Sequence, residues 1–177
     1  MNRSLISDAY RKLQTDLHNR EDSYGTASVT MAPLVARIVE KTGPASILDY
    51  GAGKQRLATT LAKQVSNLPP IHAYDPAIPE IAHTPEPADL VACIDVLEHI
   101  EPDNLDSVIE DLARLTRKNL VASIATGPAK RILGDGRNAH LIQQPAEWWL
   151  PKLWRYFHVM DMSHPDMSRF WLRATPR

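Results

Sequence analysis

The sequence is short of several features, and each shortage excludes a class of protein. One cysteine, Cys93, is present among 177 residues, which excludes an intrachain disulfide and a cysteine-rich zinc site. No apolar run approaches the roughly 20 residues that a membrane helix needs. The charged start, MNRSLISDAY, lacks the apolar core of a signal peptide. We therefore expect a soluble protein of the reducing cytoplasm, without a membrane partner.

The sequence also lacks a marked excess of acidic or basic residues, because 20 basic and 21 acidic residues leave a net charge of −1. Nothing in that total requires a nucleic acid as partner. The charges are nevertheless unevenly placed. No base lies between Lys63 and Arg114, a stretch that holds 11 of the 21 acids, and residues 114–137 then carry six bases against one acid. Solvated faces explain this pattern, and so do a cation site followed by a site for an anionic substrate.

Length and pattern together predict the fold. A chain of this size forms one domain, residues 1–177. Hydrophobic periodicity predicts helices at 4–19, 30–41, 54–66, 103–117 and 145–156, and strands at 46–50, 71–75, 90–94, 120–124, 157–163 and 168–174. This alternation predicts an α/β protein with a doubly wound, mostly parallel sheet that ends in an antiparallel hairpin. We expect 1–27 to form a helical cap and 126–156 a loop and helix on the substrate side.

A glycine turn follows the first predicted strand and indicates a ligand site. Asp49-x-Gly51-x-Gly53 precedes a helix whose free amides can meet a ligand. The second predicted strand ends in Asp75, where a carboxylate can accept both ribose hydroxyls of a nucleoside. A dinucleotide site needs a third glycine where Arg56 stands, which disfavours a nicotinamide-dependent oxidoreductase. Asp49 suits the ammonium of an amino acid, so the turn favours S-adenosylmethionine (SAM).

Three segments in order resemble motifs of the class I SAM-dependent methyltransferases, in the small-molecule branch that includes ubiquinone-pathway O-methyltransferases. They are Ile47–Lys54, Tyr74–Pro76 and Asp89–His99. The resemblance implies a Rossmann-like methyltransferase sheet. It also implies a role for each matching residue: Gly51, Ala52 and Gly53 against the methionine part, Asp49 organising that end, Asp75 on the ribose, Pro76 near the adenine, and Ile94 and Asp95 beside the cofactor.

The sequence departs from the family pattern in two places. Gln55 stands where the family often has a third glycine. The proline-rich run 76–87 replaces the segment that usually contributes an acid near the adenine, so we expect the third strand to be short or missing.

The third motif and a later histidine suggest a chemical centre. Asp95, Glu98 and His99 share one face if the chain is helical there, and His140 lies in a loop that can return to the same rim. Two carboxylates and two imidazoles suit Mg²⁺, Mn²⁺, Fe²⁺ or Zn²⁺. This set is similar to that of the small-RNA 3′-terminal 2′-O-methyltransferases, which use two Glu and two His. Alternatively, His99 or His140 acts as a metal-free base with Glu98 holding the tautomer, or the residues are structural.

The predicted function is transfer of a methyl group from SAM to a small-molecule or sugar-like acceptor, by O-methylation. Lys130, Arg131 and Arg137 can clamp an anionic group of the acceptor, although a solvated loop explains them equally well. Trp148, Trp149 and Trp154 suit core packing, with stacking against an aromatic acceptor as the alternative.

Two rival functions remain open. One is a metal-dependent RNA 2′-O-methyltransferase, against which the net charge of −1 counts. The other is a catalytically silent methyltransferase-fold binding partner, which is motivated by Gln55 and the missing adenine segment. The oligomeric state is open.

Overall fold

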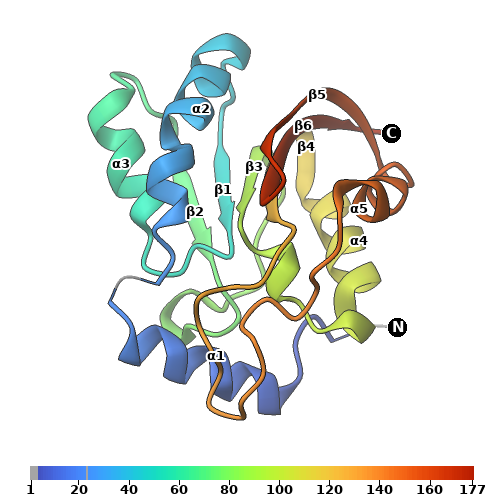
Figure 1. The fold of residues 1–177 in the computed structure, drawn as a ribbon. Helices are drawn as coiled ribbons and strands as arrows, with labels where there is room; N and C mark the ends of the chain where they lie inside the picture. Colours follow the sequence, from blue (N-terminus) through green and yellow to red (C-terminus); the bar gives the residue numbers. More distant parts are fainter. Residues whose placement is uncertain (1–3, 23) are drawn as a thin grey trace.

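The computed structural model describes residues 4–22 and 24–177 (Figure 1). Residues 1–3 and 23 of the expected N-terminal cap lie outside this description. The helices are α1 (Asp8–Arg20), α2 (Ala27–Thr42), α3 (Arg56–Gln64), α4 (Leu105–Leu115) and α5 (Ala146–Leu153). The strands are β1 (Ile47–Tyr50), β2 (Ile71–Tyr74), β3 (Ala88–Ile94), β4 (Thr116–Ala125), β5 (Phe157–Asp166) and β6 (Arg169–Pro176).

The strands form one six-stranded sheet in the order β2-β1-β3-β4-β6-β5. The pairs from β2 to β4 are parallel, and β6 and β5 join antiparallel. The predicted α/β class, the mostly parallel sheet and the C-terminal hairpin are thus confirmed. The expected loss of a strand is also confirmed, because β2 is an edge strand and only the short 3₁₀ turn η1 (Pro79–Ile81) lies between β2 and β3.

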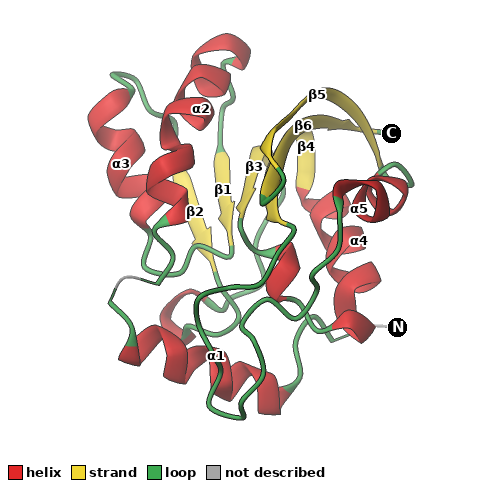
Figure 2. Cartoon of the chain, in the orientation of Figure 1, coloured by secondary structure: helices red, strands yellow, loops and turns green. Residues whose placement is uncertain are grey.

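Two helical layers cover the sheet, one on each face (Figure 2). Because side chains of a strand alternate between faces, Ile47 packs with α2 and α3 while Leu48 packs with α4 and α5. All seven residues of β3 are buried, as expected for a parallel strand covered on both faces. The remaining helix, α1, lies on neither face: it crosses the carboxyl ends of the strands (Figure 1) and packs on the loop after β4.

The N-terminal helices begin at positions that differ from the prediction. The first starts at Asp8 rather than residue 4, because Ser7 caps it by accepting a bond from the amide of Tyr10. Its buried residues are Tyr10, Gln14 and Leu17, whereas the apolar residue Ala9 is exposed. The second helix starts at Ala27, so Pro33 lies inside it rather than in its first turn.

The ends of later elements also shift. The predicted helix 103–117 ends at Leu115, because the chain passes directly into β4 at Thr116. The predicted helix 145–156 ends at Leu153. The final hairpin turns after Asp166 rather than around Pro165. Strand β5 accommodates this proline because it lies at the sheet edge, where a missing amide hydrogen breaks no ladder.

Phe170 tests the importance of the hairpin for the core. It is fully buried among residues of β4, α4 and α5. We expect Phe170→Ala to lower the free energy of unfolding by about 3–5 kcal/mol, through lost burial and the cavity left behind. Met160 on β5 is 53% exposed, so Met160→Ala should change it by less than about 0.5 kcal/mol. Urea unfolding followed by circular dichroism measures both, and equal losses would contradict this packing.

Candidate active site

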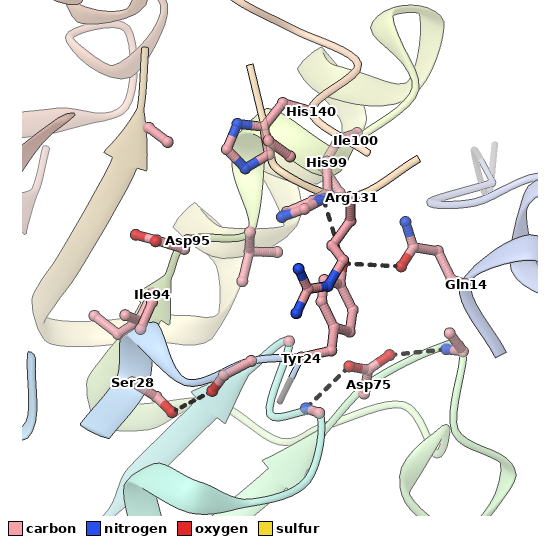
Figure 3. Close-up of a pocket in the computed structure, with 18 of the residues that line it drawn as sticks. Gln14, Tyr24, Ser28, Asp75, Ile94, Asp95, His99, Ile100, Arg131 and His140 are labelled. Carbon is pink, nitrogen blue, oxygen red and sulfur yellow. Dashed lines mark hydrogen bonds between the residues drawn. The ribbon is translucent and has the colours of Figure 1, made fainter. Parts of the chain in front are cut away.

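A cavity of about 660 Å³ opens at the carboxyl ends of β1, β2 and β3, between the sheet and α1. Figure 3 shows residues that line it. Its volume lies within the roughly 300–1,000 Å³ typical of ligand sites. The predicted site residues that line it are Asp49, Gly51, Ala52, Gly53, Asp75, Pro76, Ile94, Asp95, His99 and His140. Parallel strands explain this meeting, since their carboxyl ends share one edge of the sheet.

The glycine turn after β1 requires backbone shapes that other residues rarely adopt. Gly51 has φ +76°, and a Cβ added there would lie 2.5 Å from Cγ2 of Val96. The amides of Gly51 and Ala52 both donate to the carbonyl of Tyr74, at 2.7 and 3.0 Å, which ties the turn to the end of β2. Gln55 keeps a left-handed φ of 54°, so the missing third glycine leaves the turn in place at a cost of about 1–2 kcal/mol.

Two acids with different surroundings lie next to this turn, Asp49 before it in β1 and Asp75 at the end of β2. Asp75 accepts the amides of Gly53 (3.0 Å) and Ala77 (2.9 Å), which fixes its carboxylate at the end of β2. Asp49 is buried, and its Oδ2 has no hydrogen-bond partner among the described residues. Burial, and secondarily the charge of Asp75, raises the pKa of Asp49 to about 7. An incoming cationic group would therefore find an unpaired acceptor at Asp49.

A second group consists of Glu98, His99 and His140; both histidines line the cavity, and Glu98 lies buried beside them. One ligand atom from each residue lies within 4.8 Å of the other two, and the two imidazole centroids are 4.8 Å apart. Nδ1 of His99 is 2.7 Å from the carbonyl of Ala139, and Nδ1 of His140 is 2.7 Å from that of Gly127. Because a carbonyl only accepts, each neutral imidazole carries its proton on Nδ1 and keeps a lone pair on Nε2.

Burial sets the charges in this group. Glu98 is fully buried behind the cavity, and its Oε1 accepts the amide of Ala125 at 2.8 Å, while Oε2 has no partner among the described residues. Burial raises the pKa of Glu98 well above its usual range. Burial, followed by the neighbouring His140, lowers the pKa of His99 to about 3. A neutral imidazole and an unpaired buried carboxyl oxygen are groups that a divalent cation can use.

Asp95 does not join this group, although the sequence placed it there. The chain is not α-helical after β3: Asp95 has φ 52°, and Glu98 and His99 lie in the 3₁₀ turn η2 (Leu97–His99). The carboxylate of Asp95 accepts the hydroxyl of Ser123 and lies 3.8 Å from Arg169. It borders the cavity from the end of β3.

The predicted bases and tryptophans divide between cavity and surface. Lys130 and Arg131 line the cavity, whereas Arg137 pairs with Asp135 at 2.8 Å and lies outside its lining. Arg131 also pairs with Glu21, at 3.2 Å. Trp149 is fully buried and donates to the carbonyl of Gln144, which favours the core interpretation. No tryptophan is among the described residues that line the cavity.

A family comparison decides the class of enzyme. Residues 23–169 match the model of a family described as "Methyltransferase domain". The chain belongs to this methyltransferase family. The match confirms the resemblance to class I SAM-dependent methyltransferases that the three motifs predicted. A comparison of the sequence with curated proteins finds no match.

Solved structures share the fold of this methyltransferase at low sequence identity. One is the Burkholderia thailandensis 1,6-didemethyltoxoflavin-N1-methyltransferase with bound 1,6-didemethyltoxoflavin and S-adenosylhomocysteine (SAH). Its TM-score is 0.68 at 17% sequence identity, and the match covers 99% of this chain and 93% of that chain. A second is the magnesium protoporphyrin IX methyltransferase of Synechocystis PCC 6803 with bound SAH. Its TM-score is 0.65 at 15% identity, covering 95% of this chain and 100% of that chain. A third is the small RNA methyltransferase HEN1, with a TM-score of 0.64 at 13% identity, covering 83% of this chain and 25% of that chain.

The sequence missed the contribution of the N-terminal helix to the methyltransferase site. Tyr10, Gln14 and His18 of α1 line the cavity, and so does Tyr24, which follows the helix. The sequence did contain a signal for this contribution. Tyr10 and Gln14 are four residues apart and so lie on the same side of α1, which is its buried side. None of the helices in the described ranges 4–22 and 24–177 is long and apolar enough to cross a membrane.

Gly51 provides a test of the turn. We expect Gly51→Ala to abolish measurable SAH binding and to lower the free energy of unfolding by about 1–3 kcal/mol, because the new Cβ would meet Val96 at a left-handed φ. Gly127 also lines the cavity but has open space around it, so Gly127→Ala should bind SAH as the wild type does. Calorimetry and urea unfolding measure the pair, and normal SAH binding by Gly51→Ala would contradict the geometry.

Proposed function

We propose that this SAM-dependent methyltransferase transfers the methyl group to an oxygen of a small-molecule or sugar-like acceptor, and that Glu98, His99 and His140 hold a divalent cation at the acceptor end. The observation that carries the proposal is the placement of two different groups at one cavity. Asp49 and Asp75 flank the glycine turn, and the two histidines face the same space from η2 and from the loop after β4.

In this proposal Asp49 and Asp75 bind different parts of the cofactor. SAM carries an ammonium at one end and ribose hydroxyls in its middle. The unpaired Oδ2 of Asp49 suits the ammonium, directly or through ordered water. Asp75 is held by two backbone amides and retains lone pairs for the ribose hydroxyls. Pro76 then borders the adenine, and Ile94 and Asp95 border the cofactor from β3.

The cluster fits a divalent cation by its donor set. Because His99 has a pKa of about 3, its imidazole stays neutral at physiological pH and its Nε2 lone pair is free for a ligand bond. The same low pKa makes His99 a weak base by itself. Carbonyl partners on Nδ1 are typical of metal-ligating histidines. A bound cation would lower the pKa of an acceptor hydroxyl.

The remaining demand on the protein is positional. Methyl transfer is an in-line displacement, so the acceptor oxygen must lie about 3–3.5 Å from the methyl carbon and opposite the leaving sulfur. Lys130 and Arg131 border the acceptor end and suit an anionic group on the acceptor.

Cofactor binding should release a proton near neutral pH. Free Asp49 has a pKa of about 7, and the ammonium of SAH favours its carboxylate. The affinity for SAH should therefore rise as the pH increases through about 7 and level off above it, where free Asp49 is already deprotonated. Calorimetry at pH 6.5 in buffers of different ionisation enthalpy measures the release, up to about one proton per molecule. Asp49→Asn should release none, and equal release by wild type and variant would overturn the role of Asp49.

Chelation and substitution of Glu98 test the proposed cation site. We expect Glu98→Gln to weaken Mn²⁺ binding at least 100-fold, since loss of an outer partner alone costs about 10–100-fold, and SAH binding should persist. The matched control is Glu110→Gln, an exposed acid on α4. Calorimetry with Mn²⁺ and assays of hydroxyl acceptors with and without EDTA provide the measurements. Activity that survives EDTA but is lost in His140→Ala would instead support a metal-free base.

A second candidate is RNA 2′-O-methylation. It is favoured by the Glu98, His99 and His140 cluster, because the small RNA 2′-O-methyltransferases that the sequence resembles use two Glu and two His. A charge of −1 disfavours it. RNA as acceptor would give a steep loss of affinity with salt as phosphate contacts release counterions. A small acceptor should show a weak salt dependence.

A further inference from the structure

Side chains of the N-terminal segment form a closed ring of hydrogen bonds around His99. Nδ1 of His99 lies 3.3 Å from the hydroxyl of Tyr24, and that hydroxyl is 3.2 Å from Oε1 of Gln14 (Figure 3). Nε2 of Gln14 is 2.6 Å from the hydroxyl of Tyr10. The hydroxyl of Tyr10 in turn donates to the backbone carbonyl of His99 at 2.5 Å. Through Tyr24 and Tyr10, Gln14 is therefore linked to both the imidazole ring and the backbone carbonyl of His99.

Only one arrangement of hydrogens satisfies every member of this ring. The carbonyl of His99 only accepts, so Tyr10 donates to it and accepts from the amide nitrogen of Gln14. The oxygen of the same amide accepts the hydroxyl hydrogen of Tyr24. The hydroxyl oxygen of Tyr24 is then left to share the Nδ1 proton of His99 with the carbonyl of Ala139. Burial raises the pKa values of Tyr10 and Tyr24, so both hydroxyls stay protonated.

We propose that Gln14 is a positioning residue that acts with the carbonyl of Ala139 to keep the proton of His99 on Nδ1. By accepting the hydroxyl hydrogen of Tyr24, Gln14 keeps that hydrogen away from Nδ1 of His99. Nδ1 therefore retains its own proton, and the lone pair remains on Nε2. Through Tyr10, the same amide holds the 3₁₀ turn that carries His99. The use of that lone pair for a cation or a proton rests on the proposed function, whereas the tautomer itself does not.

The burial of Gln14 supports a specific role rather than surface anchoring. The residue is 6% exposed and lies on the buried face of α1. A buried amide without partners would cost several kcal/mol relative to water, so its two bonds must be made together. Thr15, its neighbour, anchors α1 elsewhere, because its hydroxyl lies 2.7 Å from the carbonyl of Ala77. These adjacent residues separate positioning of His99 from simple attachment of the helix.

The test is the tautomer of His99, read from imidazole ¹⁵N chemical shifts of full-length protein labelled on histidine, at pH 7 without cofactor or cation. The seven histidine signals are assigned with His99→Asn. In the wild type we expect one His99 form, with a protonated Nδ1 and a bare Nε2. In Gln14→Leu the hydroxyl of Tyr24 loses its acceptor and turns toward Nδ1. A second form protonated on Nε2 should then appear.

The double variant gives the decisive result. Gln14→Leu combined with Tyr24→Phe removes the competing hydroxyl, so the single Nδ1-protonated form should return, since Ala139 still accepts it. Tyr24→Phe alone should keep that form. Thr15→Val is the matched control and should leave the His99 signals unchanged. Gln14→Met replaces Gln14→Leu if SAH binding or circular dichroism shows that the leucine variant does not fold.

Two results would overturn the proposal. A single, unchanged Nδ1-protonated form in Gln14→Leu would mean that Ala139 alone sets the tautomer. The same new form in Thr15→Val would mean that any loosening of α1 produces it. Both results are independent of SAM, cation and acceptor, so they are distinguishable from a failure of the proposed reaction.

Discussion

The parallel pairing of β1 with β2 and β3 is the constraint on which the site depends. Tyr50 and Tyr74 are in register, so β1 and β2 end together, and β3, whose Ala92 pairs with Asp49, ends two residues further on at Ile94. The glycine turn, Asp75 and the 3₁₀ turn of His99 therefore leave the sheet side by side. Gly51 makes this closeness possible, because no side chain fits between its backbone and Val96. The cavity exists where these three chain segments diverge.

Burial gives the acids of the cavity different tasks. Asp75 is satisfied by two amides, whereas Asp49 and Glu98 each keep an oxygen without a partner among the described residues and have raised pKa values. An unpaired buried acceptor is costly in an empty cavity, and a cationic ligand offsets that cost. Asp49 lines the cavity beside the glycine turn, whereas Glu98 lies buried behind it, next to His99. The proposal assigns a positive group to each acid, the cofactor ammonium to Asp49 and the divalent cation to Glu98.

The N-terminal helix completes a site whose motifs come from the sheet. It adds Tyr10, Gln14 and His18 to the lining, and it packs its apolar face on the loop that carries His140. Its hydrogen-bond ring reaches His99 at both ring and backbone. The cavity is thereby lined by the ends of the sheet strands, by α1 and by the loop after β4.

The sequence by itself determined the α/β class, the antiparallel hairpin, the missing strand and the glycine turn, because each rests on local periodicity or on a motif. Local patterns placed Asp95 with Glu98 and His99, but its left-handed backbone turns it toward Ser123. They also did not indicate that Tyr10 and Gln14 are buried on α1, since the hydroxyl of Tyr10 contacts His99, 89 positions away. Tertiary structure alone decided which side chains meet, because the charge and tautomer of His99 follow from neighbours that sequence spacing cannot reveal.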